Sequence, residues 1–162
     1  MRALYSLTPP SPAARTGTTP GAERPAKLYR LAERELAVSV PPWAYELLAR
    51  LLAEAAESDT TGSVRSTLHG VAQDVGRQIS TKSGGDLVTA LRGGGYQPQT
   101  GPDGGIELRN CPFHRLAQEH RDLVCGLNLR LVEGMITGST QPGARAGLTP
   151  SPDRCCVVVR GG

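Results

Sequence analysis

The sequence is poor in aromatic residues and contains no long apolar run. Its 162 residues include one Phe, one Trp and four Tyr, so a core must be built mainly from aliphatic side chains. No stretch approaches the roughly 18 apolar residues that cross a bilayer, and the N-terminus lacks the apolar region of a secretory signal. We therefore expect no membrane partner and a cytoplasmic location.

The common catalytic and nucleotide-binding motifs are also missing. The sequence contains no Walker loop, no GxGxxG after a strand, no HExxH and no GxSxG. A nucleophilic pair of Cys111 and His114 would lack an orienting third group and an oxyanion site. We therefore predict that the protein is not an enzyme.

Basic charge is concentrated at the N-terminus. Residues 1–40 hold six basic and three acidic side chains, whereas residues 41–162 hold twelve of each. Residues 8–26 are rich in Pro, Thr, Gly and Ala and cannot bury enough apolar surface to order themselves, while the alternating runs 3–7 and 27–31 on either side predict a strand hairpin. We interpret residues 1–40 as a basic arm that attracts polyanions.

Residues 41–162 are predicted to form a separate domain of α+β class. Apolar periodicity and turn residues predict, in order, a helix over 42–57, a second helix to about residue 80, a short helix over 84–92, a hairpin of 96–99 with 106–109, a helix over 120–137, a loop over 138–147 and a strand over 155–159. The first helix is amphipathic, with Leu47, Leu48, Leu51 and Leu52 on its apolar side. In the second, the small residues Gly70, Ala72 and Gly76 predict close helix packing.

All four cysteines, Cys111, Cys125, Cys155 and Cys156, lie in the last third of the chain. In a reducing compartment this favours a metal site, a redox thiol or buried packing over disulfides. Cys111 and His114 lie three residues apart at a predicted strand-to-helix turn, where N–H groups at the helix start would lower the pKa of the Cys111 thiol. Cys125 projects from the buried stripe of the helix that follows.

Four ligands can be assembled from these residues. Because side chains alternate along a strand, only one of Cys155 and Cys156 is expected to face the site. Cys111, His114, Cys125 and Cys155, or Cys156 in its place, would suit zinc or an iron–sulfur cluster. The competing interpretation is that the cysteines are core residues. His120 is predicted to face solvent or to cap a helix.

Several blocks of the sequence resemble one family. They are residues 24–31 (Arg-Pro-Ala-Lys-Leu-Tyr-Arg-Leu), 95–98 (Gly-Tyr-Gln-Pro), 110–114 (Asn-Cys-Pro-Phe-His), 123–125 (Leu-Val-Cys) and the pair Cys155-Cys156. Together they are similar to bacterial ArsR-like winged helix-turn-helix transcriptional regulators related to the iron–sulfur repressor SufR. The resemblance implies an N-terminal domain that binds operator DNA, a C-terminal domain that senses a ligand or cluster, and a homodimer.

The chain departs from that family in two places. A helix-turn-helix of several dozen residues should precede Arg24, but only 23 residues do; we therefore expect a truncated DNA-binding domain, a wing remnant followed by a helical hairpin and a small α+β sensory domain. Lys27 and Arg30 on the wing strand would contact DNA phosphates without specifying sequence. A family cysteine also falls near Ser139, so His114 or the second cysteine of the 155/156 pair must complete the ligand set.

The sequence thus predicts a transcriptional regulator that senses zinc or an iron–sulfur cluster through Cys111, His114, Cys125 and Cys155. The alternative is a stand-alone small-molecule-binding or interaction module with structural cysteines and no DNA binding. Its apolar ligand would lie between the helices of residues 42–80 and the sheet.

Overall fold

The computed structural model describes residues 5–6, 30–31, 45–101, 104–141, 143–151 and 154–161, and it divides into two units, residues 1–43 and 44–162. In the first unit, β1 (Tyr5–Ser6) pairs antiparallel with β2 (Arg30–Leu31), with Tyr5 opposite Leu31. This confirms the predicted pairing of the two N-terminal runs. Arg30 therefore lies on a strand, and Lys27 lies outside the described residues. The interpretation as a wing stays a prediction.

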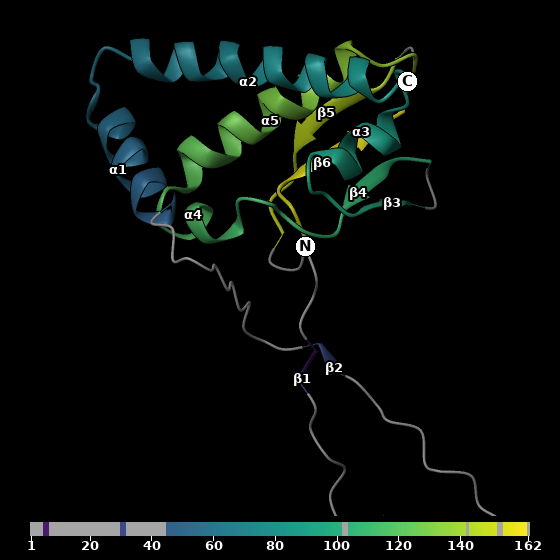
Figure 1. Ribbon diagram of the computed structural model, residues 1–162, viewed down its shortest axis with the longest axis horizontal. Helices are drawn as coiled ribbons and strands as arrows, with labels where there is room; N and C mark the ends of the chain where they lie inside the picture. Colours follow the sequence, from purple (N-terminus) through teal and green to yellow (C-terminus); the bar gives the residue numbers. More distant parts are fainter. Residues whose placement is uncertain are drawn as a thin grey trace, which may run out of the picture. The chain divides into compact units, whose positions relative to one another are not determined.

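The second unit consists of five helices and four strands among its described residues (Figure 1). A four-stranded antiparallel sheet has the strand order β3-β4-β6-β5, which confirms the α+β class. In chain order the elements are α1 (Tyr45–Ser58), α2 (Ser63–Lys82), α3 (Leu87–Gly93), β3 (Pro98–Thr100), β4 (Ile106–Leu108), α4 (His114–Glu119), α5 (Arg121–Thr137), β5 (Arg145–Leu148) and β6 (Val157–Arg160).

The prediction of a loop over 138–147 is wrong at its last three residues, because β5 begins at Arg145. Its sequence, Arg-Ala-Gly-Leu, carries neither strict alternation nor β-branched residues, so no local signal marks it. Its partner β6 is the strand that buries three valines in a row. Ala146 pairs with Val159 and Leu148 pairs with Val157, which gives hydrogen-bond partners to the backbone N–H and C=O groups of β6 on the side away from β4. Strand β5 therefore forms because β6 needs a partner, not because of its own sequence.

Helices α2 and α5 cross at glycines. A Cβ atom on Gly76 would lie 2.1 Å from the Leu131 carbonyl oxygen, and one on Gly134 would lie 2.1 Å from that of Gln73. The two backbones can approach this closely only because neither residue has a side chain. The predicted use of Gly76 and of Ala72, which is buried, is therefore confirmed, whereas a Cβ on Gly70 would meet open space.

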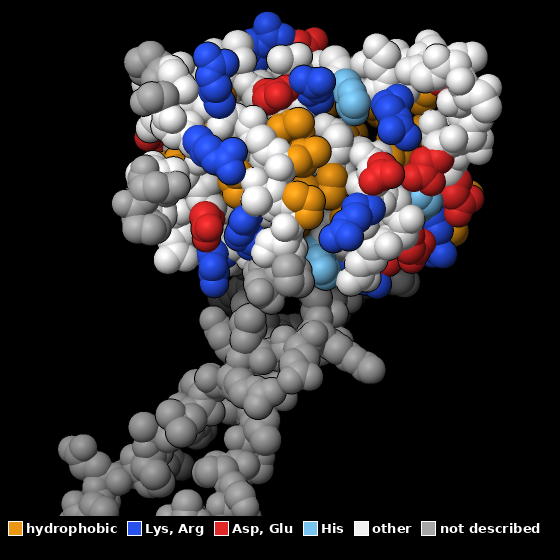
Figure 2. All heavy atoms as spheres, turned by 180° about the vertical axis from the view of Figure 1, so that it is seen from behind, with side chains coloured by type: hydrophobic (Ala, Val, Ile, Leu, Met, Phe, Trp, Pro, Cys, Tyr) orange, Lys and Arg blue, Asp and Glu red, His pale blue; other side chains and the backbone are white. Residues whose placement is uncertain are grey.

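The core lies where α5 and α3 pack with the sheet. Its fully buried side chains come from four elements: Leu87 and Leu91 from α3, Leu108 from β4, Val132 and Met135 from α5, and Val157 from β6. On the face shown in Figure 2, hydrophobic side chains gather at the centre, among charged ones. No helix among the described residues is long and apolar enough to cross a membrane.

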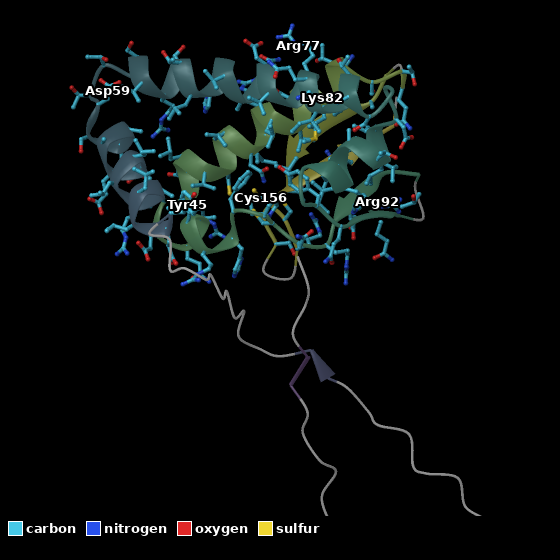
Figure 3. All side chains as sticks on the ribbon, in the orientation of Figure 1. Tyr45, Asp59, Arg77, Lys82, Arg92 and Cys156 are labelled. Carbon is cyan, nitrogen blue, oxygen red and sulfur yellow. The ribbon has the colours of Figure 1, made fainter. Side chains whose placement is uncertain are left out.

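Helix α1 contacts the rest of its unit through its small residues. Ala53 and Ala56 are buried and form a second, smaller cluster with Leu123. The turn that follows is held by Asp59 (Figure 3), whose carboxylate accepts hydrogen bonds from the backbone N–H groups of Thr61 and Val64. The leucine side of the predicted amphipathic helix is exposed, with Leu47, Leu48, Leu51 and Leu52 each more than half accessible.

Candidate functional site

The fold brings all four cysteines to one place. Cys111 follows β4, Cys125 lies in the second turn of α5, and Cys155 and Cys156 immediately precede β6. Strands β4 and β6 are neighbours, and the Cys155 N–H donates to the Leu108 carbonyl at 2.9 Å. Several sulfur atoms accordingly lie close to the labelled Cys156 (Figure 3).

The turn that carries Cys111 is fixed by the preceding asparagine. The Asn110 side chain accepts from the Gln97 N–H at 2.6 Å and donates to the Gly95 carbonyl at 2.9 Å. It thereby ties the end of β4 to the glycine turn after α3. The His114 N–H then donates to the Cys111 carbonyl at 3.1 Å and starts α4, which fixes the backbone on both sides of the thiol.

The four thiols influence one another's ionisation. Hydrogen bonding with Cys111 and with Cys156 lowers the pKa of Cys155 and raises the pKa of each of these two partners. Hydrogen bonding with Cys125 further raises the pKa of Cys156. Cys155 is at the centre and is 1% exposed, whereas the other three are half-buried.

A buried amide supports the central thiol. Asn128 of α5 is fully buried; its Nδ2 lies 3.1 Å from Cys155 Sγ and 3.9 Å from Cys111 Sγ. The Tyr96 hydroxyl donates to Asn128 Oδ1, so both ends of the amide are used. The sequence analysis assigned no role to Asn128. A lone polar residue among apolar ones was the available signal, because buried polar groups need partners.

The hydrogen bonds divide the thiols into one acceptor and two donors. The Cys111 thiol, then Cys156, the Val157 N–H and Asn128, hold the pKa of Cys155 well below its ordinary value, against the opposing effect of burial. Donation to Cys155, with burial, raises the pKa of Cys111 and of Cys156. Burial, followed by the nearby thiols, raises the pKa of Tyr96, so its hydroxyl stays a donor.

The predicted lowering of the Cys111 pKa is therefore wrong. A backbone hydrogen bond from Phe113 does favour the Cys111 thiolate, as a helix start should. That contribution is smaller than the cost of ionising a thiol that donates to a neighbouring sulfur. The thiolate forms at Cys155 instead, where four donors converge.

The cysteine pair and His114 also differ from the predicted arrangement. Both Cys155 and Cys156 join the cluster, because they precede β6 and the alternation of strand side chains does not apply to them. His114 is exposed in the first turn of α4, and its Nε2 lies 3.1 Å from the Gln118 amide nitrogen. The cluster thus contains Cys156 where the sequence favoured His114.

His120 occupies a helix cap position, at the end of α4 and the start of α5, as one of the two predicted alternatives has it, but it does not face solvent. It is buried, with its Nδ1 2.8 Å from Glu57 Oε2. Its side chain makes no capping hydrogen bond at the start of α5. Glu57 lies in the last turn of α1, so this contact joins two helices that are distant in sequence, and sequence periodicity gave no sign of it.

Four thiols form a donor set that suits zinc or an iron–sulfur cluster, because both prefer soft sulfur ligands. As the side chains stand, however, no group of three or more His, Cys, Asp or Glu among the described residues is placed to hold a metal ion. Metal binding would have to remove the thiol protons and turn the side chains towards a common point.

Comparisons of the chain with protein-family models, with curated proteins and with solved structures gave no match.

Proposed function

We propose that the protein is a transcriptional regulator whose C-terminal unit binds zinc or an iron–sulfur cluster through cysteine thiols. The observation that carries the proposal is that four cysteines from three separate segments lie together around the buried Cys155, to which the Asn128 amide also donates. Packing alone does not require a buried thiol to be supplied with several hydrogen-bond donors. A ligand sulfur does, because donors to a metal-bound thiolate orient it and tune its charge.

The proposed ligands are Cys111, Cys125, Cys155 and Cys156. When bound, the metal or cluster would replace the thiol protons and offer a centre whose loss or oxidation changes the local packing. Asn128 would keep its hydrogen bond to Cys155, and Tyr96 would keep the amide oriented. His114 is the alternative fourth ligand, and it would have to turn away from Gln118 to serve.

The test of this centre is the content of iron, acid-labile sulfide and zinc per chain, measured on protein purified without oxygen. We expect iron with matching sulfide, or one zinc, and loss of either in Cys111→Ser. His114→Ala is the matched control and should retain the metal. A chain with neither metal, or a Cys111→Ser variant with unchanged content, would overturn the proposal. Loss in His114→Ala together with retention in Cys156→Ser would restore the original ligand set.

DNA binding is proposed for the N-terminal unit and rests on its basic residues and on the family resemblance. Lys27 and Arg30 would contact phosphates. Affinity for a DNA duplex should then fall as salt rises, and each single replacement, Lys27→Ala or Arg30→Ala, should reduce the slope of that dependence by about one. Equal affinities of the variants and the wild type over a salt series would contradict this part of the proposal and leave the metal centre standing.

A shift in the packing of α5 is the proposed link between the centre and the rest of the chain. Cys125 and Asn128 both lie on α5, and Gly134 of the same helix crosses α2 without a side chain between the backbones. A change in the sulfur positions would therefore act on a helix that has little room to move without displacing its neighbour. We propose that a homodimer transmits this change.

A further inference from the structure

Helix α1 displays an apolar stripe that no described residue of its own unit covers. Leu47, Leu48, Leu51 and Leu52, here called the leucine stripe, are between 51% and 62% exposed. At about 100° per residue they fall within an arc of about 140°. The helix packs on its neighbours through Ala53 and Ala56, which lie about 100° and about 40° beyond the Leu52 edge of this arc, so most of the stripe points away from the unit.

An isolated exposed leucine needs no explanation, but a contiguous stripe of four marks an interaction surface. The alanine side buries little apolar area, so the leucines are the larger part of the apolar surface of this helix. The remaining arc, between Ala53 and Leu47, carries Glu46, Glu57, Arg50 and Glu54. This distribution of side chains is typical of a helix that contacts its own unit through its alanines and a second protein surface through its leucines.

We propose that the leucine stripe is the homodimer interface, formed by antiparallel packing of α1 against α1 of a second copy. This inference names the contact surface of the homodimer in the proposed function. It is carried by α1 alone, so it does not depend on whether the thiols bind a metal.

Charge complementarity favours a second copy as the occupant. We place the two-fold axis of an antiparallel pair at Leu51, so that Arg50 of the first copy lies level with residue 52 of the second copy. Glu54 of the second copy is then two residues farther along its helix, which is about 3 Å along the helix axis. Arg50 and Glu54 flank the same edge of the stripe, and the two-fold axis places like edges together. Two Arg50–Glu54 pairs therefore form, one on each side of the axis.

The interface is small, because a helix of 14 residues is about 21 Å long. We therefore expect a dimer with a dissociation constant of about 1–100 μM rather than a permanent assembly. The centre of the interface is Leu51, where replacement by a charged residue places two like charges next to each other across the axis.

The experiment is sedimentation of the full chain, reduced and metal-free, at concentrations up to about 100 μM. We expect a concentration-dependent dimer for the wild type and a monomer for Leu51→Glu. Leu148→Glu is the matched control, since Leu148 is exposed to a similar degree on β5 and should leave the dimer intact. A monomeric wild type would mean that another partner, or residues 1–43, cover the stripe, and it would overturn the proposal. A dimeric Leu51→Glu variant would do the same.

A charge-reversal cycle tests the orientation of the two copies. Arg50→Glu and Glu54→Arg should each weaken the dimer about tenfold, and the double variant should return to within about twofold of the wild type. Circular dichroism of each variant checks that α1 is still formed. Additive losses in the double variant would contradict the antiparallel arrangement. The metal content of these variants is measured separately, so failure of the interface and failure of the thiol centre are distinguishable.

Discussion

Asn128 Nδ2 donates to Cys155 Sγ over 3.1 Å, from a side chain that is fully buried in helix α5. The amide is therefore part of the site and not a packing residue, since an apolar side chain of similar volume would fill the same space without needing partners. Its oxygen is held by Tyr96 and its nitrogen by the thiols. The orientation of the amide, and with it the donor to Cys155, is set from both ends.

Replacement of Asn128 by Leu should lower the free energy of unfolding by about 2 kcal/mol, because it leaves the Tyr96 hydroxyl and the Cys155 thiolate without a buried partner. Tyr96→Phe removes only the hydroxyl and should cost about 1 kcal/mol. Urea denaturation of the reduced, metal-free chain measures both. An Asn128→Leu variant as stable as the wild type would show that the amide is not part of a hydrogen-bonded network.

A second prediction concerns the ionisation of the thiols. The pKa of Cys155 is lowered in the folded chain, so its thiolate is present above that lowered value and is lost only as the pH falls through it. The ultraviolet absorbance of a thiolate should therefore persist below the range in which an ordinary thiol, with a pKa of about 8.5, is protonated.

Single serine variants show which cysteine produces the thiolate absorbance. Cys155→Ser should abolish it at neutral pH, because burial still disfavours ionisation of Cys111 and of Cys156 after the sulfur to which they donate is gone. Cys156→Ser should retain it, since Cys111 and Asn128 still donate to Cys155. The measurement is a pH titration of the reduced, metal-free proteins, and identical titrations for the two variants would contradict the assignment of the thiolate to Cys155.

The sequence predicted those elements whose signal is local. The apolar periods of α2 and α5 and the glycine run after α3 depend on residues close in the chain, and each corresponds to an element in the structure. Strand β5 could not be predicted, because it forms to pair with β6 and has no pattern of its own. The side of α1 that is buried could not be predicted for a similar reason. Hydrophobicity alone points to the leucines, but the fit of Ala53 and Ala56 against the neighbouring helices decides which side faces the unit.

For the site, the sequence identified the cysteines but not how they are connected. Clustering of Cys111, Cys125 and Cys155 in the last third of the chain was enough to suggest a common site. The inclusion of Cys156 depends on where β6 begins, which strand patterns do not determine to within a residue. The ionisation of Cys155 depends on donors from three segments, and such a convergence exists only in the folded chain.

The crossing of α2 and α5 gives a third prediction. Gly76→Ala should reduce stability by about 3 kcal/mol, because the new Cβ would overlap the Leu131 carbonyl, and a backbone atom cannot move aside as a side chain can. Gly70→Ala on the same helix meets nothing within 4 Å and should stabilise the protein by about 0.5–1 kcal/mol through its helix propensity. Thermal unfolding of the pair measures the difference, and equal effects would contradict the close crossing.

The last prediction concerns the attachment of α1 through His120. This side chain is buried, its Nδ1 lies 2.8 Å from Glu57 Oε2, and its Nε2 has no hydrogen-bond partner among the described residues. His120→Ala removes the contact together with packing at the junction of α1, α4 and α5, and should cost about 2 kcal/mol. Arg115→Ala removes a pair with Glu46 in which both side chains are about half exposed, and should change stability by less than about 0.5 kcal/mol.

The two variants differ in where the protein loosens. Hydrogen exchange should accelerate in the amides of α1 in His120→Ala, while α5 remains protected by its crossing with α2. Because α1 carries the leucine stripe, the same variant should also weaken the dimer, since a loosely held helix pays more ordering entropy when it pairs. Exchange that rises equally in α1 and α5 would instead mean that His120 stabilises the whole unit and does not specifically attach α1.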